Sequence, residues 1–170
     1  MEWMDEAALL ASDVVANNRM NRERGLRGVN SYARELRFDP LEFLAARRAA
    51  ARWLDVGCGS AFALAQAADE TEARGLAERL SIVGVDLVDA FHAGARGRGP
   101  LLELVAGDVR SVPLAGTFDL VTCVHSLHYV ADKLGLIEHL YGLLSPEGFL
   151  AAHVDPANVV DASGRPIRGA

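Results

Sequence analysis

The chain contains the segment Trp53-Leu54-Asp55-Val56-Gly57-Cys58-Gly59-Ser60-Ala61, in which an apolar run meets an acidic residue and two glycines. A helical pattern follows at once, so the segment predicts a buried strand, a tight turn and the start of a helix. Gly57 and Gly59 have no Cβ, so the turn can adopt positive φ and a ligand can approach the backbone closely. The helix that begins near Ser60 offers unpaired N–H groups and a partial positive charge. We therefore expect a ligand site at this turn.

Asp55 narrows the class of ligand. A dinucleotide-binding turn follows the pattern G-x-G-x-x-G and places a pyrophosphate on the helix N-terminus. Phe62 stands where the third glycine of that pattern would fall, and the carboxylate of Asp55 would repel a phosphate. A site that combines the negative charge of Asp55 with the partial positive charge of a helix N-terminus suits a zwitterion joined to a nucleoside better than a pyrophosphate. An ordinary strand-to-helix turn without a ligand remains the alternative at this point.

Three further apolar runs lead into residues suited to ligand binding. Residues 81–87 read Ser-Ile-Val-Gly-Val-Asp-Leu, residues 101–109 read Leu-Leu-Glu-Leu-Val-Ala-Gly-Asp-Val, and residues 118–124 read Phe-Asp-Leu-Val-Thr-Cys-Val. Near-continuous runs of this kind are typical of parallel strands that are buried on both faces. The acid that ends the second strand, Asp86, can accept hydrogen bonds from both hydroxyls of a ribose.

The second half of the chain continues the alternation of strand and helix. Asp132 is a good N-cap, and apolar residues at helical spacing follow it: Leu134, Ile137, Tyr141 and Leu144. A turn at 145–148 precedes a fifth strand at 149–154. Residues 89–99 contain three glycines, so the helix after the second strand should be short. The alternation predicts an α/β fold with a doubly wound, mostly parallel sheet.

From Arg52 to Val154 the chain resembles class I S-adenosylmethionine-dependent methyltransferases of the small-molecule type. Asp-Val-Gly-Cys-Gly-Ser-Ala, at 55–61, resembles the family's first motif, acidic-x-G-x-G-x-G, with Ala61 in place of the last glycine. Leu-His-Tyr at 127–129 and Leu-Leu-Ser-Pro-Glu-Gly-Phe-Leu at 143–150 resemble the segments after strand four and into strand five. The resemblance implies a Rossmann-like sheet and S-adenosylmethionine as the cofactor.

The resemblance also implies how the cofactor is held. The turn after strand one would take the methionine end, the tip of strand two the ribose, the loop after strand three the adenine, and the tip of strand four would lie near the sulfonium. In this family, helices before strand one commonly cover the cofactor. The implied cofactor-binding residues are Asp55, Gly57, Cys58, Gly59, Asp86, Leu87, Gly107, Asp108, Val109, Cys123, Val124 and, from the segment before strand one, Tyr32.

Two histidines are the candidate catalytic residues. Methyl transfer from a sulfonium is an in-line displacement that depends mainly on positioning, and a general base helps if the acceptor carries a proton. His125 and His128 follow strand four, at the edge where open α/β sheets place their ligands. The alternative is that His128 packs on the sheet and His125 lines the pocket without moving a proton. The five histidines show no acid–histidine spacing typical of a metal site, so no metal is expected.

Composition and charge limit the partners. The net charge of −6 does not favour a polyanion, although Arg outnumbers Asp and Glu by nine to four between residues 17 and 52. That leader lacks interleaved aromatic residues, so we expect its arginines to pair with nearby acids rather than bind nucleic acid.

The sequence contains no run of about 18 apolar residues that would predict a membrane span. Two cysteines cannot form a disulfide framework, and the acidic start is unlike a signal peptide, so we expect a cytoplasmic protein.

The length of 170 residues predicts a single domain in three parts. We expect an N-terminal helical leader or lid at 1–52, with a helix at 41–52, an α/β core at 53–154 and a tail at 155–170. The family's sheet normally has seven strands, and we expect strands six and seven to be missing here. Strand five would then be an exposed edge. Truncation, a homodimer that covers this edge, and a vestigial binding domain are the three explanations, and truncation fits the tail best.

The sequence therefore predicts an enzyme that transfers a methyl group from S-adenosylmethionine to a small-molecule substrate. The alternative is a truncated or non-catalytic relic of that fold, which binds the cofactor or forms oligomers. A nicotinamide-dependent oxidoreductase is a second rival within the same fold class.

Overall fold

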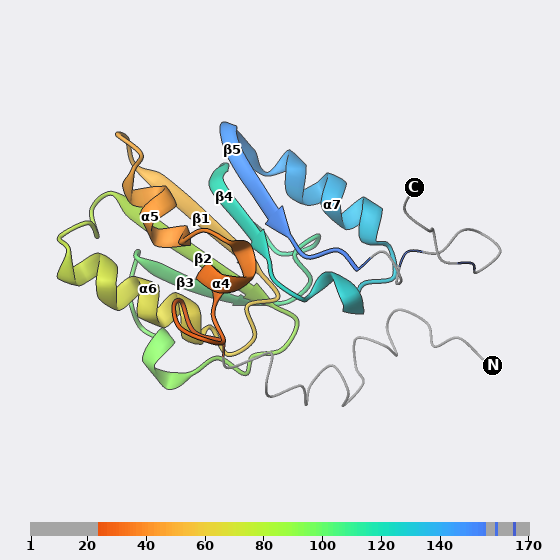
Figure 1. Ribbon diagram of the computed structural model, residues 1–170, viewed down its shortest axis with the longest axis horizontal. Helices are drawn as coiled ribbons and strands as arrows, with labels where there is room; N and C mark the ends of the chain where they lie inside the picture. Colours follow the sequence, from red (N-terminus) through yellow and green to blue (C-terminus); the bar gives the residue numbers. More distant parts are fainter. Residues whose placement is uncertain (1–23, 156–158, 160–164, 166–170) are drawn as a thin grey trace.

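The computed structural model describes residues 24–155, 159 and 165 (Figure 1). Five strands form one sheet in the order β3-β2-β1-β4-β5, and every neighbouring pair is parallel. The strands are β1 (Ala51–Val56), β2 (Leu80–Asp86), β3 (Leu102–Ala106), β4 (Phe118–Cys123) and β5 (Leu144–Ala152). The predicted parallel α/β sheet is therefore confirmed. The strand order reverses between β1 and β4, the position at which open α/β sheets bind ligands.

Helices cover both faces of the sheet, which explains the near-continuous apolar runs. The α-helices are α4 (Tyr32–Leu36), α5 (Pro40–Ala45), α6 (Phe62–Ala73) and α7 (Lys133–Gly142). Alternate strand residues face opposite sides. Trp53, Ile82 and Leu120 pack with α5 and α6, whereas Leu54, Val83 and Val121 pack on the side of α7. Each face thus has its own apolar core.

Close contact between α6 and the sheet depends on small residues. A Cβ on Gly84 of β2 would lie 2.6 Å from a methyl of Leu64 in α6 and 2.9 Å from one of Leu104 in β3. Four alanines of α6 are buried in the same layer: Ala63, Ala65, Ala67 and Ala68. The helix that follows the glycine-rich turn is therefore held tightly against β2, which fixes the position of its N-terminus.

Several element boundaries differ from the predictions. The helix expected at 41–52 ends at Ala45, and Arg52 already lies in β1. The residues expected as a turn at 145–148 lie within β5, whose register against β4 shifts between Phe118 and Leu120. The ladder is therefore irregular at the segment that contains Pro146, as is typical where a proline interrupts an edge strand. The short helix expected after strand two is confirmed, because only a 3-10 turn forms, at Ala93–Ala95.

The buried face of α7 also differs from the prediction. The side chain of Asp132 accepts a hydrogen bond from the Gly135 N–H, so the expected N-cap is confirmed. Leu136 and Leu140 face the core, whereas Leu134 and Tyr141 are 68% and 71% exposed. The helix is apolar on more than one face, so periodicity alone did not identify the side that packs on the sheet.

β5 is an edge strand. It pairs with β4 on one side, and no described residue pairs with it on the other. Phe149 remains 47% exposed although its ring contacts Phe38 and Phe43. The prediction that strand five is an exposed edge is thus confirmed. Within the described ranges, no helix has both the length and the apolar character needed to cross a bilayer.

The open edge predicts self-association. The N–H of His153 donates to the carbonyl of Cys123 in the ladder, and strand alternation points the N–H of Ala152 to the open side. Ala152→Pro removes that donor and should lower the weight-average sedimentation coefficient at high protein concentration, with an unchanged urea midpoint as the control for folding. A wild-type chain that sediments as a monomer at all concentrations would contradict the expected association.

Candidate functional site

The carboxyl ends of the parallel strands meet at one edge of the sheet, and most of the predicted site residues lie there. Asp55 lies in β1 and Asp86 ends β2, while Asp108 follows β3 after one glycine. His125 lies two residues beyond β4. Because the strands are neighbours in the order β3-β2-β1-β4, the structure brings these groups into one row of strand tips.

The glycine-rich turn is held by β2 and by the loop after β4. Gly57, Gly59 and Ala61 have φ of 72°, 60° and 58°, so two positions favour glycine and the third is a strained alanine. A Cβ on Gly57 would lie 2.2 Å from the Cβ of Ser126, and the Ser126 hydroxyl donates to the Val56 carbonyl at 2.8 Å. Ser126 could not be identified from the sequence, because this contact joins residues that are far apart in the chain.

Asp86 holds the same turn from the other side. One oxygen accepts a hydrogen bond from the Gly59 N–H at 2.8 Å, and the other accepts one from the Val88 N–H at 3.1 Å. Leu87 lies between these bonded positions and is half-buried. Cys58, inside the turn, is buried and free, and its N–H donates to the Val85 carbonyl. The tips of β1 and β2 therefore form one hydrogen-bonded unit.

Asp55 is fully buried beneath the turn. Thr122 of β4 donates to one carboxyl oxygen at 2.5 Å, and Tyr32 of α4 donates to the other at 2.7 Å. Trp53 in turn donates its indole N–H to the Thr122 hydroxyl at 2.8 Å. Burial raises the pKa of Asp55 to about 7, although both hydrogen bonds oppose this shift. In this structure the carboxyl group expected to receive an ammonium group is covered by Tyr32.

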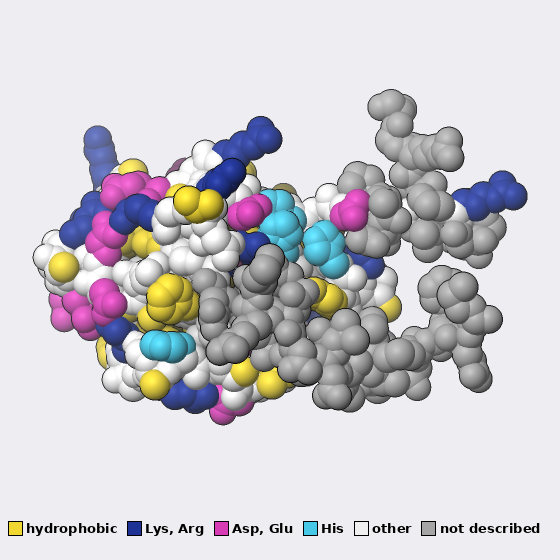
Figure 2. Space-filling model, turned by 60° about the horizontal axis from the view of Figure 1, so that its bottom comes forward, with side chains coloured by type: hydrophobic (Ala, Val, Ile, Leu, Met, Phe, Trp, Pro, Cys, Tyr) yellow, Lys and Arg dark blue, Asp and Glu magenta, His cyan; other side chains and the backbone are white. Residues whose placement is uncertain are grey.

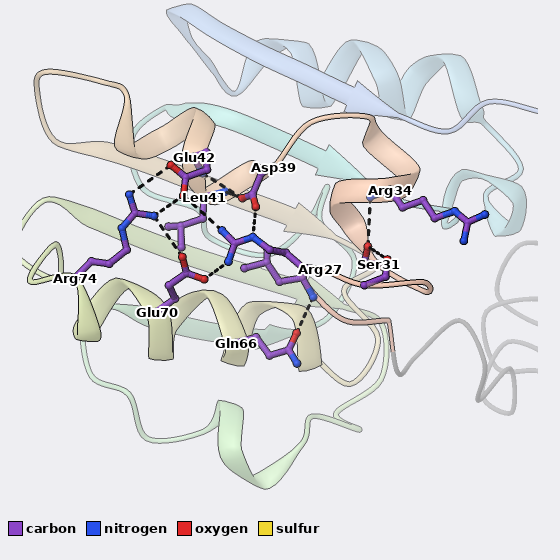
Figure 3. Close-up of polar contacts among 11 residues, drawn as sticks. Arg27, Ser31, Arg34, Asp39, Leu41, Glu42, Gln66, Glu70 and Arg74 are labelled. Carbon is purple, nitrogen blue, oxygen red and sulfur yellow. Dashed lines mark hydrogen bonds and ion pairs between the residues drawn. The ribbon is translucent and has the colours of Figure 1, made fainter.

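Tyr32 is thus placed at the site, but with a different partner from the expected cofactor. Its ring packs edge-on against Trp53, with the centroids 6.2 Å apart. Burial, with a smaller contribution from the Asp55 charge, raises the pKa of its hydroxyl well above the ordinary value, so the group acts as a neutral donor. Arg34 donates to the Val29 carbonyl, and in Figure 3 its guanidinium extends away from α6.

Asp108 lies in the loop after β3. Its carboxylate pairs with the Arg110 guanidinium at 2.7 Å and accepts the Arg110 backbone N–H at 2.9 Å. The hydrogen bond from the Arg110 side chain lowers the pKa of Asp108 below its ordinary value, so this carboxylate is ionised at neutral pH. The flanking Gly107 has φ of 149°, and Val109 is buried.

The tip of β4 supplies the remaining predicted cofactor residues. Cys123 and Val124 are buried, and the Cys123 thiol lies 3.0 Å from the Ser126 hydroxyl. Burial raises the pKa of the Cys123 thiol to about 12, so it is a neutral, unreactive group. The Cys123 carbonyl accepts the His153 N–H, which ties the end of β5 to this tip.

The two candidate catalytic histidines lie in one cluster with Glu35 and His153, which were not among the predicted site residues. His125 has φ of 57°, and its Nε2 lies 3.0 Å from Oε2 of Glu35 in α4. Its ring stacks on that of His153 at 4.3 Å between centroids, and the His128 ring lies 5.8 Å away. Contact with His125 lowers the pKa of Glu35. Glu35, His125 and His153 come from separate parts of the chain, so spacing could not reveal the cluster.

Ion pairs attach the leader to α6 (Figure 3). Arg27 bonds both Asp39 and Glu70, and the Leu26 N–H donates to the Gln66 side chain at 2.7 Å. Arg74 pairs with Glu42 at 2.7 Å, which extends the network to α5. Of the leader's arginines, Arg27 pairs with acids as expected, whereas the side chains of Arg34 and Arg52 donate to backbone carbonyls. This network fixes the segment that carries α4 above the strand tips.

The pKa of Asp55 predicts a specific pH dependence of stability. Because the folded-state pKa is raised above that of the unfolded chain, the folded state holds the extra proton between pH ~4 and ~7, and stability falls as pH rises through that window. Asp55→Asn removes this contribution, so the free energy of unfolding should vary less with pH than in the wild type, by a few kcal/mol at most. Urea unfolding from pH 4.5 to 8 measures both slopes, and equal slopes would contradict the assignment.

The comparisons with known proteins agree with this geometry. The family described as a methyltransferase domain matches residues 54–152, more than half of the chain. Trans-aconitate 2-methyltransferase of Escherichia fergusonii is 36% identical over 73 residues, which cover 43% of this chain and 29% of that protein.

Solved structures share the fold. CalS10, an amino pentose methyltransferase from Micromonospora echinaspora solved with S-adenosylmethionine bound, is 34% identical, covers 82% of this chain and 54% of its own, and has a TM-score of 0.51. A methyltransferase from Thiobacillus denitrificans, solved with S-adenosylhomocysteine, is 20% identical with a TM-score of 0.53, over 88% of this chain and 55% of its own. The chain spans about half the length of these two structures and under a third of the trans-aconitate enzyme. With the glycine-rich turn and all five strand tips within or beside the matched region, the chain belongs to the class I S-adenosylmethionine-dependent methyltransferase family.

Proposed function

We propose that this chain binds S-adenosylmethionine along the tips of β1, β2, β3 and β4 and transfers its methyl group to a small molecule. The observation that carries the proposal is the unit formed by Asp86 and the turn at Gly57–Gly59. A carboxylate fixed by two backbone N–H groups lies beside a positive-φ glycine turn, which places an acceptor next to backbone that carries no side chain at Gly57 and Gly59. The family match and the cofactor-bound relatives support this choice of ligand.

Each part of the cofactor has a group of matching chemistry. Carboxylate oxygens of Asp86 suit the ribose hydroxyls, and the ionised Asp108 on the neighbouring tip suits the amino group of adenine. The methionine end would meet the backbone at Gly57 and Gly59. The Tyr32 hydroxyl is hydrogen-bonded to the Asp55 carboxyl. The ammonium group of the cofactor could contact this carboxyl only after Tyr32 had moved away, so its access depends on the position of α4.

Positioning accounts for most of the proposed chemistry. When bound, S-adenosylmethionine supplies an electrophilic methyl group, which the acceptor approaches in line with the carbon–sulfur bond. His125 lies at the tip of β4 with its ring orientation fixed by Glu35, and His128 lies beside it. We assign to one of these two rings the role of taking a proton from a hydroxyl or amine acceptor.

A small acceptor fits the charge distribution better than nucleic acid. Arg27, Arg74 and Arg110 each pair with carboxylates of this chain, so their charge is already balanced.

The two free cysteines are compatible with a reducing compartment, and we propose a cytoplasmic location on that ground.

The non-catalytic alternative has one observation in its favour. β5 has no second partner strand within the described residues. Separately, the structure of the [4+2]-cyclase SpnF has the same fold at 22% identity and a TM-score of 0.57. The fold alone therefore does not establish methyl transfer. Binding of S-adenosylmethionine without consumption of its methyl group would favour a binding or oligomerising relic.

Asp86→Asn tests the cofactor site. Replacing the carboxylate should weaken binding of S-adenosylhomocysteine by about 1–3 kcal/mol, because ribose hydroxyls and backbone donors lose a charged acceptor. Isothermal titration calorimetry measures the effect. Asp89→Ala, which removes an exposed acid three residues further on, is the matched control and should bind like the wild type. Equal affinity of Asp86→Asn and wild type would remove the ribose assignment.

Turnover is tested with methyl-labelled S-adenosylmethionine and a panel of small hydroxy, amino and carboxylic acids. We expect label in a product, and a loss of at least about 100-fold in rate for the double variant His125→Ala/His128→Ala with unchanged cofactor affinity. Binding of NADH, with indifference to S-adenosylhomocysteine, would favour the oxidoreductase instead.

A further inference from the structure

One cluster at the strand tips contains a set of metal-binding side chains. Glu35 comes from α4, His125 from the tip of β4, and His153 from the residue after β5. One ring nitrogen of each histidine and a carboxylate oxygen of Glu35 all lie within 4.8 Å of one another. Figure 2 shows histidine side chains gathered beside an acidic side chain at the surface.

The chemistry of the three groups is specific. Two imidazoles and one carboxylate are typical ligands of Zn²⁺ and of other divalent ions of the first transition row, whereas Mg²⁺ and Ca²⁺ prefer oxygen ligands alone. The side chains of Glu35, His125 and His153 are 30%, 30% and 27% exposed. An ion could therefore enter from solvent, and water could occupy a remaining coordination position.

The proposed ligand atoms already contact one another, and an ion would replace these contacts. Oε2 of Glu35 faces the histidines, at 3.0 Å from His125 and 3.9 Å from His153. The neighbouring cation, Arg24, approaches the other oxygen, Oε1, at 3.9 Å. The Nδ1 atom of His153 is buried without a hydrogen-bond partner among the described residues. Its ring is held by the stack on His125 and by Nε2, which lies 3.2 Å from the backbone carbonyl oxygen of Glu35 and 3.9 Å from Oε2.

Binding requires a small rearrangement of the rings. The lone pair of a ring nitrogen lies in the ring plane, and the two rings are stacked with 27° between their planes, so the lone pairs do not converge on one point. Rotation of the partly exposed His153 ring about χ2 would redirect its lone pair and would break the contact between its Nε2 and the Glu35 carbonyl oxygen. The carboxylate lies at the end of both rings and can remain where it is.

We propose that Glu35, His125 and His153 form a three-ligand site for a divalent transition-metal ion such as Zn²⁺. The ion would join α4 to the tips of β4 and β5. Tyr32, three residues before Glu35 on the same helix, covers Asp55, so the metal would hold this helix closed over the edge of the sheet. The proposal concerns metal binding alone and does not depend on methyl transfer.

The test uses the full chain after removal of metal with a chelator. Titration with Zn²⁺ in a calorimeter, and with Co²⁺ by visible absorption, should saturate at one ion per chain. Glu35→Gln and His153→Ala should each weaken binding about tenfold or more, with circular dichroism as the check on folding. His92→Ala, which removes an exposed histidine outside the cluster, is the control and should bind like the wild type.

Two results would overturn the proposal. One is the absence of saturable binding of either ion to the wild-type chain. The other is binding that Glu35→Gln and His153→Ala leave unchanged while both variants remain folded. In that case the three side chains form only a hydrogen-bonded contact between α4 and the sheet.

Discussion

The buried carboxyl of Asp55 links the three parts of the molecule that form the site. It lies in β1 and accepts hydrogen bonds from Thr122 of β4 and Tyr32 of α4. Burial of a carboxyl without partners costs several kcal/mol, so β4 and α4 must both keep their places for this group to be tolerated. The Asp55 side chain thus joins β1 to β4, where the strand order reverses. It also attaches α4 of the leader above the carboxyl edge of the sheet.

This arrangement connects the leader to the chemistry of the edge. Tyr32 and Glu35 lie three residues apart on α4 and therefore project to the same side of the helix. The first contacts Asp55, and the second contacts His125 at the tip of β4. Ion pairs of Arg27 with Asp39 and Glu70 hold the preceding segment on α6. A movement of α4 would therefore change the methionine end of the proposed cofactor site and the proposed acceptor side together.

The sequence allowed the architecture to be predicted wherever the signal is local. Apolar runs rich in Val and Leu indicated the strands, Asp132 indicated the start of α7, and the glycines at 94, 97 and 99 indicated the short segment between β2 and β3. Contacts between distant residues could not be predicted in this way. The apolar residues of α7 did not identify Leu136 and Leu140 as the buried pair, and nothing local placed Glu35 beside His125 or Ser126 against Gly57. These positions depend on how the elements pack.

The central claim is that the strand tips at Gly57–Gly59, Asp86 and Asp108 form one nucleoside site. The most direct measurement is the set of backbone amide chemical shifts in a ¹H–¹⁵N spectrum, recorded while S-adenosylhomocysteine is added. We expect saturable shifts of the Gly59, Leu87 and Val109 amides together, with Gly142 at the end of α7 unaffected. Shifts confined to other surfaces, or none at these three amides at saturating ligand, would contradict it.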